Sequence, residues 1–188
     1  MELELRNENS KIFIISGKAR QGKDIVAGYM KKYYEESGLK VILLSYGEYI
    51  KNYAKKIVDW DGSDETKPRT LLQMLGTDLI RNKIDKHLFI KRMIEDIKIY
   101  TYFFDIIIIT DARLVDEIEI IKSNFTDAIS INLTRPNFES ELNSKEVKHI
   151  TEIGLDGYDK YDIKITNDST LEKLEEKVRK VLGDLNEN

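Results

Sequence analysis

The sequence predicts an α/β protein in which a five-stranded parallel sheet lies between two layers of helices. Short apolar runs rich in β-branched residues alternate with amphipathic helical patterns along the chain. The first run leads into a helix, and a second run follows that helix. This order is a βαβ unit, whose strands are parallel and whose crossover is right-handed. At 188 residues the chain is expected to form a single domain.

The loop after the first apolar run, residues 11–16, carries the clearest functional signal. Gly17, Gly22 and Lys23 have the Gly-x4-Gly-Lys spacing of a P-loop. Glycines let backbone N–H groups turn towards phosphate oxygens, and the following helix N-terminus adds partial positive charge. We therefore predict a nucleotide-phosphate site, with a chance glycine-lysine loop as the alternative. Its candidate residues are Gly17, Lys18, Ala19, Arg20, Gln21, Gly22, Lys23, Asp24 and Ile25.

Asp24 stands where the common P-loop pattern has a serine or threonine that holds magnesium. A carboxylate is a hard oxygen ligand, so Asp24 can still bind magnesium at this position. The same carboxylate adds negative charge beside the phosphates. Asp24 is therefore a candidate metal ligand, without the geometry that the common pattern would imply.

The remaining elements follow from periodicity and from start and stop signals. Gly38 is a helix stop, and Pro68 suits a first helical position because its missing N–H is not needed there. Gly76, Thr77 and Asp78 are unfavourable inside a helix, which predicts a break or a functional contact. Helices are expected at about 24–36, 46–58, 68–81, 85–100 and 114–123 and after Ser169, and strands at 40–45, 103–111, 128–133 and 160–167.

Asp111 ends the strongest predicted strand, which contains four consecutive isoleucines. The carboxyl ends of parallel strands are where α/β folds bind ligands, and an acidic residue there can orient magnesium. The alternative is that Asp111 is the N-cap of the helix at 114–123. Arg113 lies two residues later, and its position beside Asp111 favours a role in gripping an anion. His87, at a predicted helix start, is interpreted as packing or capping in preference to catalysis.

Residues 134–160 form a polar stretch with weak periodicity, which contains Arg135, Lys145, Lys148, His149 and Glu152. Loops of this length in one domain are usually functional or disordered. A lid over the phosphates and an insertion without function remain alternatives. Residues 1–10 are expected to be a leader before the first strand.

Composition narrows the classes of function. The net charge of −4 does not favour binding of polymeric nucleic acid, which selects basic surfaces. The absence of cysteine excludes disulfides, thiolate metal sites and cysteine nucleophiles. No apolar run approaches the ~20 residues that span a bilayer. We expect a cytoplasmic protein with no membrane partner.

Together these motifs resemble the P-loop nucleoside monophosphate kinases, and most closely the phage-type deoxynucleoside monophosphate kinases. The resemblance runs from Ile12 to about Val181 and depends on the order and spacing of its pieces. The Gly-Lys-Asp ending of the loop also looks like that of such kinases and of animal-type phosphomevalonate kinases. The pieces are 16–24, 68–78 with Arg81, 110–113 with Glu117, Arg135, 149–152 and 162–167.

The resemblance implies a three-layer αβα P-loop NTPase fold with a lid insertion. It implies ATP with magnesium as the donor and a nucleoside or deoxynucleoside monophosphate as the acceptor. Lys23 and the loop amides would bind donor phosphates, and Asp24 and Asp111 would lie near magnesium. The acceptor-binding candidates are Arg69, Gln73, Arg81 and Arg113, and Arg135 is the candidate lid arginine. The lid has fewer arginines than many such kinases.

Other readings of the sequence stay open. Another phosphorylated acceptor, phosphomevalonate or dephospho-coenzyme A, fits the same loop. A nucleotide-binding module without transfer activity is a third alternative. The base and sugar of the acceptor do not follow from the sequence, and the chain is expected to be a monomer or a homodimer.

Overall fold

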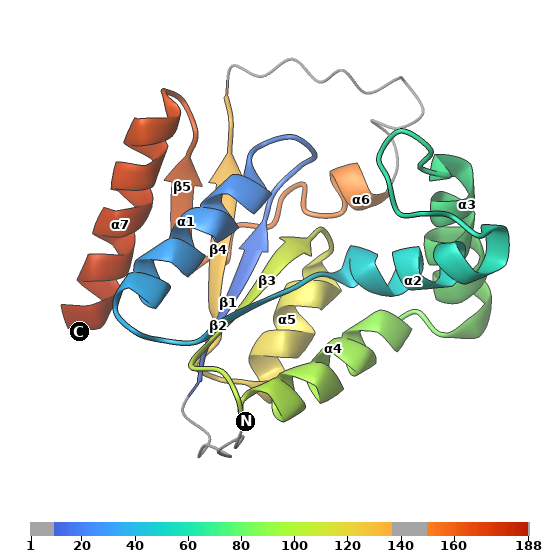
Figure 1. Ribbon diagram of the computed structural model, residues 1–188, viewed down its shortest axis with the longest axis horizontal. Helices are drawn as coiled ribbons and strands as arrows, with labels where there is room; N and C mark the ends of the chain where they lie inside the picture. The colour runs from blue at the N-terminus through green and yellow to red at the C-terminus, as the bar shows by residue number, and fades with distance from the viewer. Residues whose placement is uncertain (1–9, 137–149, 188) are drawn as a thin grey trace.

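The sheet has five parallel strands, as the sequence predicts. The computed structural model describes residues 10–136 and 150–187. Within them, the strand order is β2-β3-β1-β4-β5. All arrowheads in Figure 1 point the same way, so the carboxyl ends of the strands meet at one edge of the sheet. The strands are β1 (Lys11–Ser16), β2 (Val41–Leu44), β3 (Ile106–Ala112), β4 (Ile129–Thr134) and β5 (Ile163–Thr166).

Helices cover both faces of this sheet. One face packs against α1 (Lys23–Glu36) and α7 (Leu171–Glu187). The other packs against α2 (Tyr46–Val58), α4 (Leu88–Tyr100) and α5 (Val115–Asn124). Figure 1 shows α3 (Arg69–Gln73) beyond α2, and the short α6 (Ile150–Ile153) near the carboxyl ends of the strands. The αβα layering predicted from the sequence is confirmed.

The two cores follow from the alternation of side chains along β1. Phe13 and Ile15 face α1 and α7, whereas Ile12 and Ile14 face α4 and α5. Successive side chains of a strand point to opposite faces, so a strand covered on both sides must be apolar throughout. Ile106–Ile109 of β3 are buried for the same reason, with at most 2% of each side chain exposed. The doubly covered centre of the sheet places the end of β1 beside the ends of β3 and β4.

The helix predicted at 68–81 is only partly α-helical. After α3 the chain continues as a π-helix, η1 (Met74–Ile84). At its end the Asp85 N–H donates to the Ile80 carbonyl oxygen at 2.9 Å, which spans five residues. Gly76 is buried, and a Cβ there would lie 2.9 Å from Cδ1 of Ile50 in α2. The expected irregularity is therefore a wider helix packed closely on α2.

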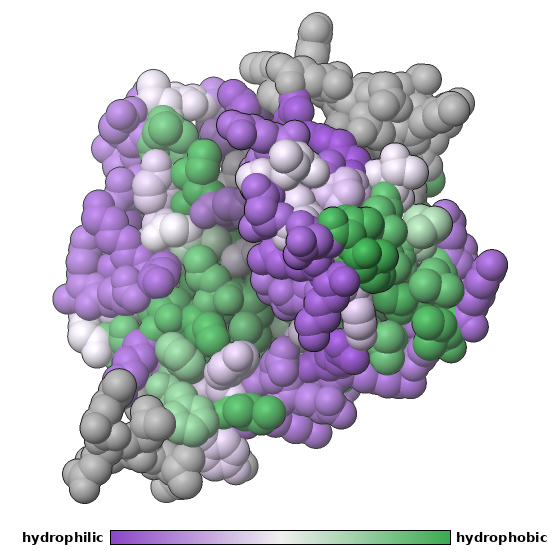
Figure 2. Space-filling view, turned by 45° about the vertical axis from the view of Figure 1, so that its right-hand side comes forward, coloured by the Kyte–Doolittle hydropathy of each residue, from purple (hydrophilic) through white to green (hydrophobic). Residues whose placement is uncertain are grey.

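Polar side chains cover much of the face shown in Figure 2, and apolar side chains gather there in separate areas. The exposed large apolar residues include Leu43 of the edge strand β2, Ile57 of α2 and Met74 of η1. In the part of the chain that the structure describes, no helix is long and apolar enough to cross a membrane. The expected cytoplasmic location stays a prediction.

Candidate active site

The loop between β1 and α1 requires its two glycines. Gly17 has φ 147° and Gly22 has φ 98°, values that residues with a Cβ rarely adopt. A Cβ at Gly17 would lie 2.5 Å from the carbonyl oxygen of Leu133, and one at Gly22 would lie 3.0 Å from Nδ2 of Asn167. The loop therefore passes close to the ends of β4 and β5, and both glycines are needed for that approach.

The Lys23 ammonium lies inside this loop. It is 7% exposed, and Nζ donates to the carbonyl oxygens of Gly17 at 2.8 Å and Lys18 at 2.7 Å. The two carbonyl oxygens provide hydrogen-bond acceptors for the buried cation. A lysine at the first position of a helix, beside a loop of backbone amides, is the arrangement that binds phosphate anions.

Side chains on either side of the loop hold its shape. The Gln21 carboxamide oxygen accepts the Lys18 N–H at 2.9 Å, and Asn167 Nδ2 donates to the Gln21 carbonyl oxygen at 3.0 Å. Asn167 is 8% exposed and is one of the site residues that sequence reasoning did not select. The polar residue at the end of a predicted strand was the available signal. Ala19 and Arg20 complete the turn, and Asp24 and Ile25 are exposed in the first turn of α1.

A cleft of about 180 Å³ opens beside the loop. Gly17, Lys18 and Gln21 line one side of it, and Arg113 lines another. Lys18 also forms an ion pair of 2.8 Å with Asp156, which follows α6. Seven further lining residues were not selected individually from the sequence: Asn132, Thr134, Thr151, Leu155, Asp156, Gly157 and Tyr161. Five of them, Thr134 to Gly157, belong to residues 134–160, the stretch for which a lid over the phosphates was one alternative.

Asp111, the penultimate residue of β3, lies at the amino end of α2. Its Oδ1 accepts the Tyr46 N–H at 2.8 Å, and its Oδ2 accepts the Gly47 N–H at 2.9 Å and the Ser45 hydroxyl at 2.8 Å. The N-terminal amides of a helix favour such a negative charge. The alternative that Asp111 caps the helix at 114–123 is wrong, because its carboxylate binds α2, which is adjacent in space and distant in sequence.

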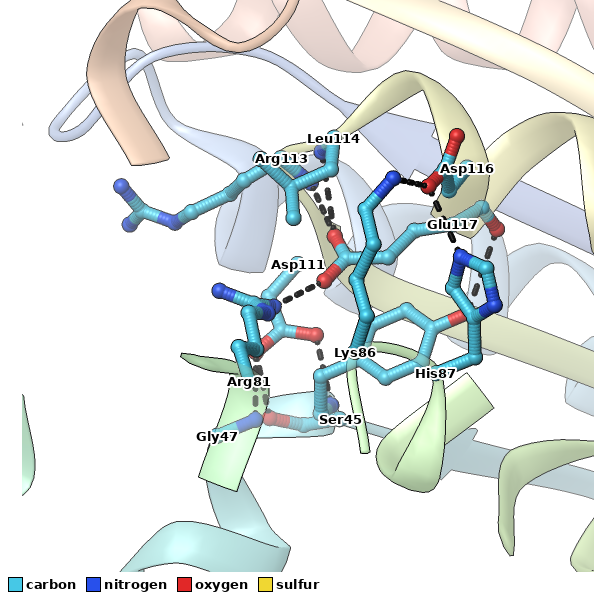
Figure 3. A network of polar contacts seen from close by, with 11 residues as sticks. Ser45, Gly47, Arg81, Lys86, His87, Asp111, Arg113, Leu114, Asp116 and Glu117 are labelled. Carbon is cyan, nitrogen blue, oxygen red and sulfur yellow. Dashed lines mark hydrogen bonds and ion pairs between the residues drawn. The ribbon is translucent and has the colours of Figure 1, made fainter. Parts of the chain in front are cut away.

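The first turn of α5 is capped instead by Glu117. Its Oε2 accepts the backbone N–H groups of Arg113 at 2.7 Å and Leu114 at 3.1 Å, while Oε1 binds Arg81 Nη2 at 2.5 Å (Figure 3). Burial raises the pKa of Glu117 to about 7, and the Arg81 charge opposes this shift. Arg81 and Arg113, both predicted to bind the acceptor phosphate, thus meet at one buried carboxylate.

His87 belongs to a separate surface group. Its Nε2 lies 2.9 Å from Oδ2 of Asp116, which also binds Lys86 at 2.5 Å. Hydrogen bonds from Lys86 and His87 hold the pKa of the Asp116 carboxyl below its usual range. Figure 3 shows this group on the side of Glu117 opposite to the Arg113 side chain. The contacts of His87 agree with its interpretation as a structural residue.

The other predicted site residues lie on the surface of the described chain. Arg69 and Gln73 are exposed on α3, and Arg135 is exposed just after β4. None of the three lines the cleft beside the loop among the residues described. The structure therefore does not place Arg69, Gln73 or Arg135 in this cleft. Lys145, Lys148 and His149 fall outside the described residues, as does the side chain of Glu152.

A magnesium ion would have carboxylates available at two places. Asp24 is exposed at the start of α1, whereas the oxygens of Asp111 already accept three donors from the start of α2. Within residues 10–136 and 150–187 no group of three or more acidic, histidine or cysteine side chains could form a metal cage. Magnesium in phosphoryl-transfer sites usually needs only one or two carboxylates, with phosphates and waters as the other ligands.

Comparison with known proteins identifies the family to which the chain belongs. The family model of deoxynucleotide monophosphate kinases matches residues 34–178, well over half of the chain. The chain belongs to the deoxynucleotide monophosphate kinase family. The resemblance inferred from the motifs is confirmed.

Two curated relatives of this family are phage proteins. The deoxynucleotide monophosphate kinase of Escherichia phage RB69 is 36% identical over 121 residues, which is 64% of this chain and 46% of that protein. The protein of the same name from Enterobacteria phage T4 is 34% identical over 120 residues, which is 63% of this chain and 46% of that protein. The match therefore spans about half the length of these relatives.

Solved structures show the same fold at low identity. An APS kinase of Mycobacterium tuberculosis has a TM-score of 0.56 at 11% identity, covering 93% of this chain and 98% of that one. The shikimate kinase of Aquifex aeolicus has a TM-score of 0.50 at 16% identity, covering 94% and 96%. At such identities the comparison shows the fold alone, which agrees with the three-layer architecture predicted from the sequence.

Proposed function

We propose that the protein transfers the γ-phosphoryl group of ATP to a nucleoside or deoxynucleoside monophosphate. The observation that carries this proposal is the position of Lys23 inside a loop of backbone amides at the end of β1. Phosphate oxygens entering the loop would replace the carbonyl oxygens of Gly17 and Lys18 as partners of the ammonium. Membership of the deoxynucleotide monophosphate kinase family supports a monophosphate as the acceptor.

The donor side of the reaction needs a divalent cation. Magnesium, when bound with ATP, neutralises charge on the outer phosphates. Asp24 is the better supported ligand because its carboxylate is exposed beside the loop. Asp111 remains the second candidate, although its oxygens already accept donors from α2.

At the acceptor the protein has to supply positive charge, and a general base is not required. A phosphate monoester is already an anionic nucleophile, so the protein has to position it in line with the donor and neutralise charge. Arginine suits this task because its planar fork binds two phosphate oxygens at once. Arg113 lines the cleft beside the loop, and Arg81 is joined to the same region through Glu117. Arg69, Gln73 and Arg135 remain further candidates.

A panel of acceptors tests the proposal directly. The protein is incubated with ATP and magnesium and with each nucleoside and deoxynucleoside monophosphate, phosphomevalonate or dephospho-coenzyme A, and products are measured by mass. The proposal expects ADP together with a nucleoside diphosphate. A product formed only from phosphomevalonate or dephospho-coenzyme A would replace the acceptor class. Stabilisation by ATP without any product would indicate a binding module instead.

Lys23→Ala tests the loop itself, with Lys31→Ala as the matched control on the same helix. Lys31 is exposed to solvent and pairs with Glu35 at 3.6 Å, away from the loop. We expect Lys23→Ala to lower kcat/KM for ATP by about 100-fold or more, as removal of one charged transition-state contact does. Lys31→Ala should retain the wild-type value. Full activity of Lys23→Ala would exclude the loop as the donor site.

A further inference from the structure

We propose that Glu117 is a positioning residue that holds the two arginines of the acceptor site in a fixed relation to each other. It would hold Arg81 through the guanidinium group and Arg113 through the backbone N–H. This inference rests on the proposed function, because it assigns the acceptor phosphate to these two arginines. Glu117 itself would touch neither substrate.

The carboxylate of Glu117 joins two elements that are far apart in the sequence. Oε1 lies 2.5 Å from Nη2 of Arg81 on η1. Oε2 lies 2.7 Å from the backbone nitrogen of Arg113, in the connection between β3 and α5. The two oxygens of one carboxylate therefore contact both η1 and the connection after β3.

Burial distinguishes this pair from exposed ion pairs such as that of Lys91 and Asp85. The side chains of Arg81 and Glu117 are 13% and 3% exposed, whereas those of Lys91 and Asp85 are 64% and 29% exposed. Exposed pairs contribute little and rearrange readily. Breaking a buried pair leaves a charge without a partner in a poorly solvated place, which is strongly unfavourable. Arg81 is thus confined to the orientation that Glu117 sets.

Glu117 is in turn held by the elements around it. The Tyr46 hydroxyl donates to the Glu117 carbonyl oxygen at 3.2 Å, and the neighbouring Tyr46 N–H donates to Asp111. Tyr46 at the start of α2 therefore links the backbone of Glu117 in α5 to Asp111 near the end of β3. Such support from surrounding hydrogen bonds is what keeps a binding group within a few tenths of an ångström of its working position.

The side chain of Arg113 extends away from the carboxylate that fixes its backbone. Figure 3 shows the Arg113 guanidinium on the side opposite to Glu117, and Arg113 lines the cleft together with Gly17 and Lys18 of the loop. Glu117 therefore anchors the point from which Arg113 reaches the cleft. Loss of this anchor should impair acceptor binding more than donor binding, because the donor loop has its own hydrogen bonds.

The test compares Glu117→Gln with Glu95→Gln, a control in which an exposed glutamate of α4 is changed. Glutamine keeps the size of the side chain and an oxygen for the Arg113 N–H but removes the charge that holds Arg81, so the assays are run at pH 8, above the pKa of about 7 that burial gives Glu117. We expect KM for the monophosphate to rise about 10- to 100-fold, a typical effect of misplaced binding groups. KM for ATP should stay within about twofold of wild type, and Glu95→Gln should match the wild type in both.

A second variant separates positioning from general loss of structure. Arg81→Ala alone should raise the acceptor KM. When Glu117→Gln is added to Arg81→Ala, the further rise in acceptor KM should be smaller than the rise that Glu117→Gln causes in the wild-type protein, because both substitutions act through one ion pair. The inference would be overturned if Glu117→Gln raised the acceptor KM equally in the wild-type and Arg81→Ala proteins. It would also be overturned if KM for ATP rose as much as KM for the acceptor. An unchanged acceptor KM in an active Glu117→Gln protein would overturn it while the proposed function stands. A wild-type protein without monophosphate kinase activity would overturn both.

Discussion

The Oδ2 atom of Asp111 accepts the backbone N–H of Gly47 at 2.9 Å, which fastens the end of the interior strand β3 to the start of α2. Gly47 also permits the approach, since a Cβ at this position would lie 3.2 Å from the same oxygen. An acidic residue at the carboxyl end of a strand is often assigned to magnesium. Here its immediate partners are the amides of a helix, so its structural contribution can be measured independently of any metal.

Asp111→Ala should lower the free energy of unfolding by about 1–3 kcal/mol, because it removes a charged acceptor from the first amides of α2. Urea denaturation followed by circular dichroism measures this change. The matched control is Asp159→Ala, at an exposed site, with an expected change within about 0.5 kcal/mol. An Asp111→Ala protein as stable as the control would show that these hydrogen bonds contribute nothing.

Gly22→Ala should destabilise the protein by about 1–2 kcal/mol, since alanine at φ 98° is strained. It should also weaken the rise in Tm on adding ATP, because the new Cβ would lie 3.0 Å from Asn167 Nδ2 and disturb the loop. Gly28→Ala is the control: it lies in α1 with nothing within 4 Å of a new Cβ. That variant should gain about 0.5–1 kcal/mol. Thermal scans with and without ATP measure both effects.

The parts of this fold that depend on neighbouring residues in sequence were predictable. The strand at 11–16, the two glycines and Lys23 lie within one short stretch, and the pattern of apolar residues placed the helices that follow. The alternation of strands and helices was enough to predict a parallel sheet. The family resemblance rested on the same local motifs, which is why it could be stated before the fold was known.

The parts that depend on packing between distant residues were not predictable. Glu117 occupies an ordinary helical position, and only the approach of Arg81, 36 residues earlier, makes it the centre of a buried pair. Asp111 was correctly placed at the end of a strand, but its partners come from α2, 64 to 66 residues away. The π-helical bonding of η1 has no periodic signature, and only Gly76, Thr77 and Asp78 marked the place.

Tyr34→Phe should stabilise the protein by about 1 kcal/mol. The Tyr34 side chain is 1% exposed, and its hydroxyl has no hydrogen-bond partner among the described residues. Burial raises the pKa of this hydroxyl to about 12, in keeping with its apolar surroundings. Tyr33→Phe is the neighbouring control, because the Tyr33 hydroxyl accepts Asn186 Nδ2 at 3.4 Å and is partly exposed. A loss of stability in Tyr34→Phe, measured by urea denaturation, would indicate a partner for the hydroxyl.

Glu117 should make stability depend on pH between about 4.5 and 7. Burial raises its pKa from the ordinary 4.5 to about 7. The charge of Arg81 on η1 and the backbone N–H groups of Arg113 and Leu114 oppose this rise. The charge of Asp111 on β3 adds to it. The folded protein therefore keeps a proton that the unfolded chain releases in this range. The stabilisation is fully present below pH 4.5 and is lost as pH rises through 7.

Glu117→Gln removes this titration. The free energy of unfolding of wild type minus that of Glu117→Gln should therefore fall as pH rises through this range, at up to about 1.4 kcal/mol per pH unit. Urea denaturation at pH 5, 6, 7 and 8 measures the difference. The Tyr46 hydroxyl on α2, whose pKa burial raises well above its ordinary value, does not titrate in this range. Glu95→Gln should show a constant difference from wild type. A constant difference for Glu117→Gln as well would mean that the carboxylate is charged throughout, held so by Arg81.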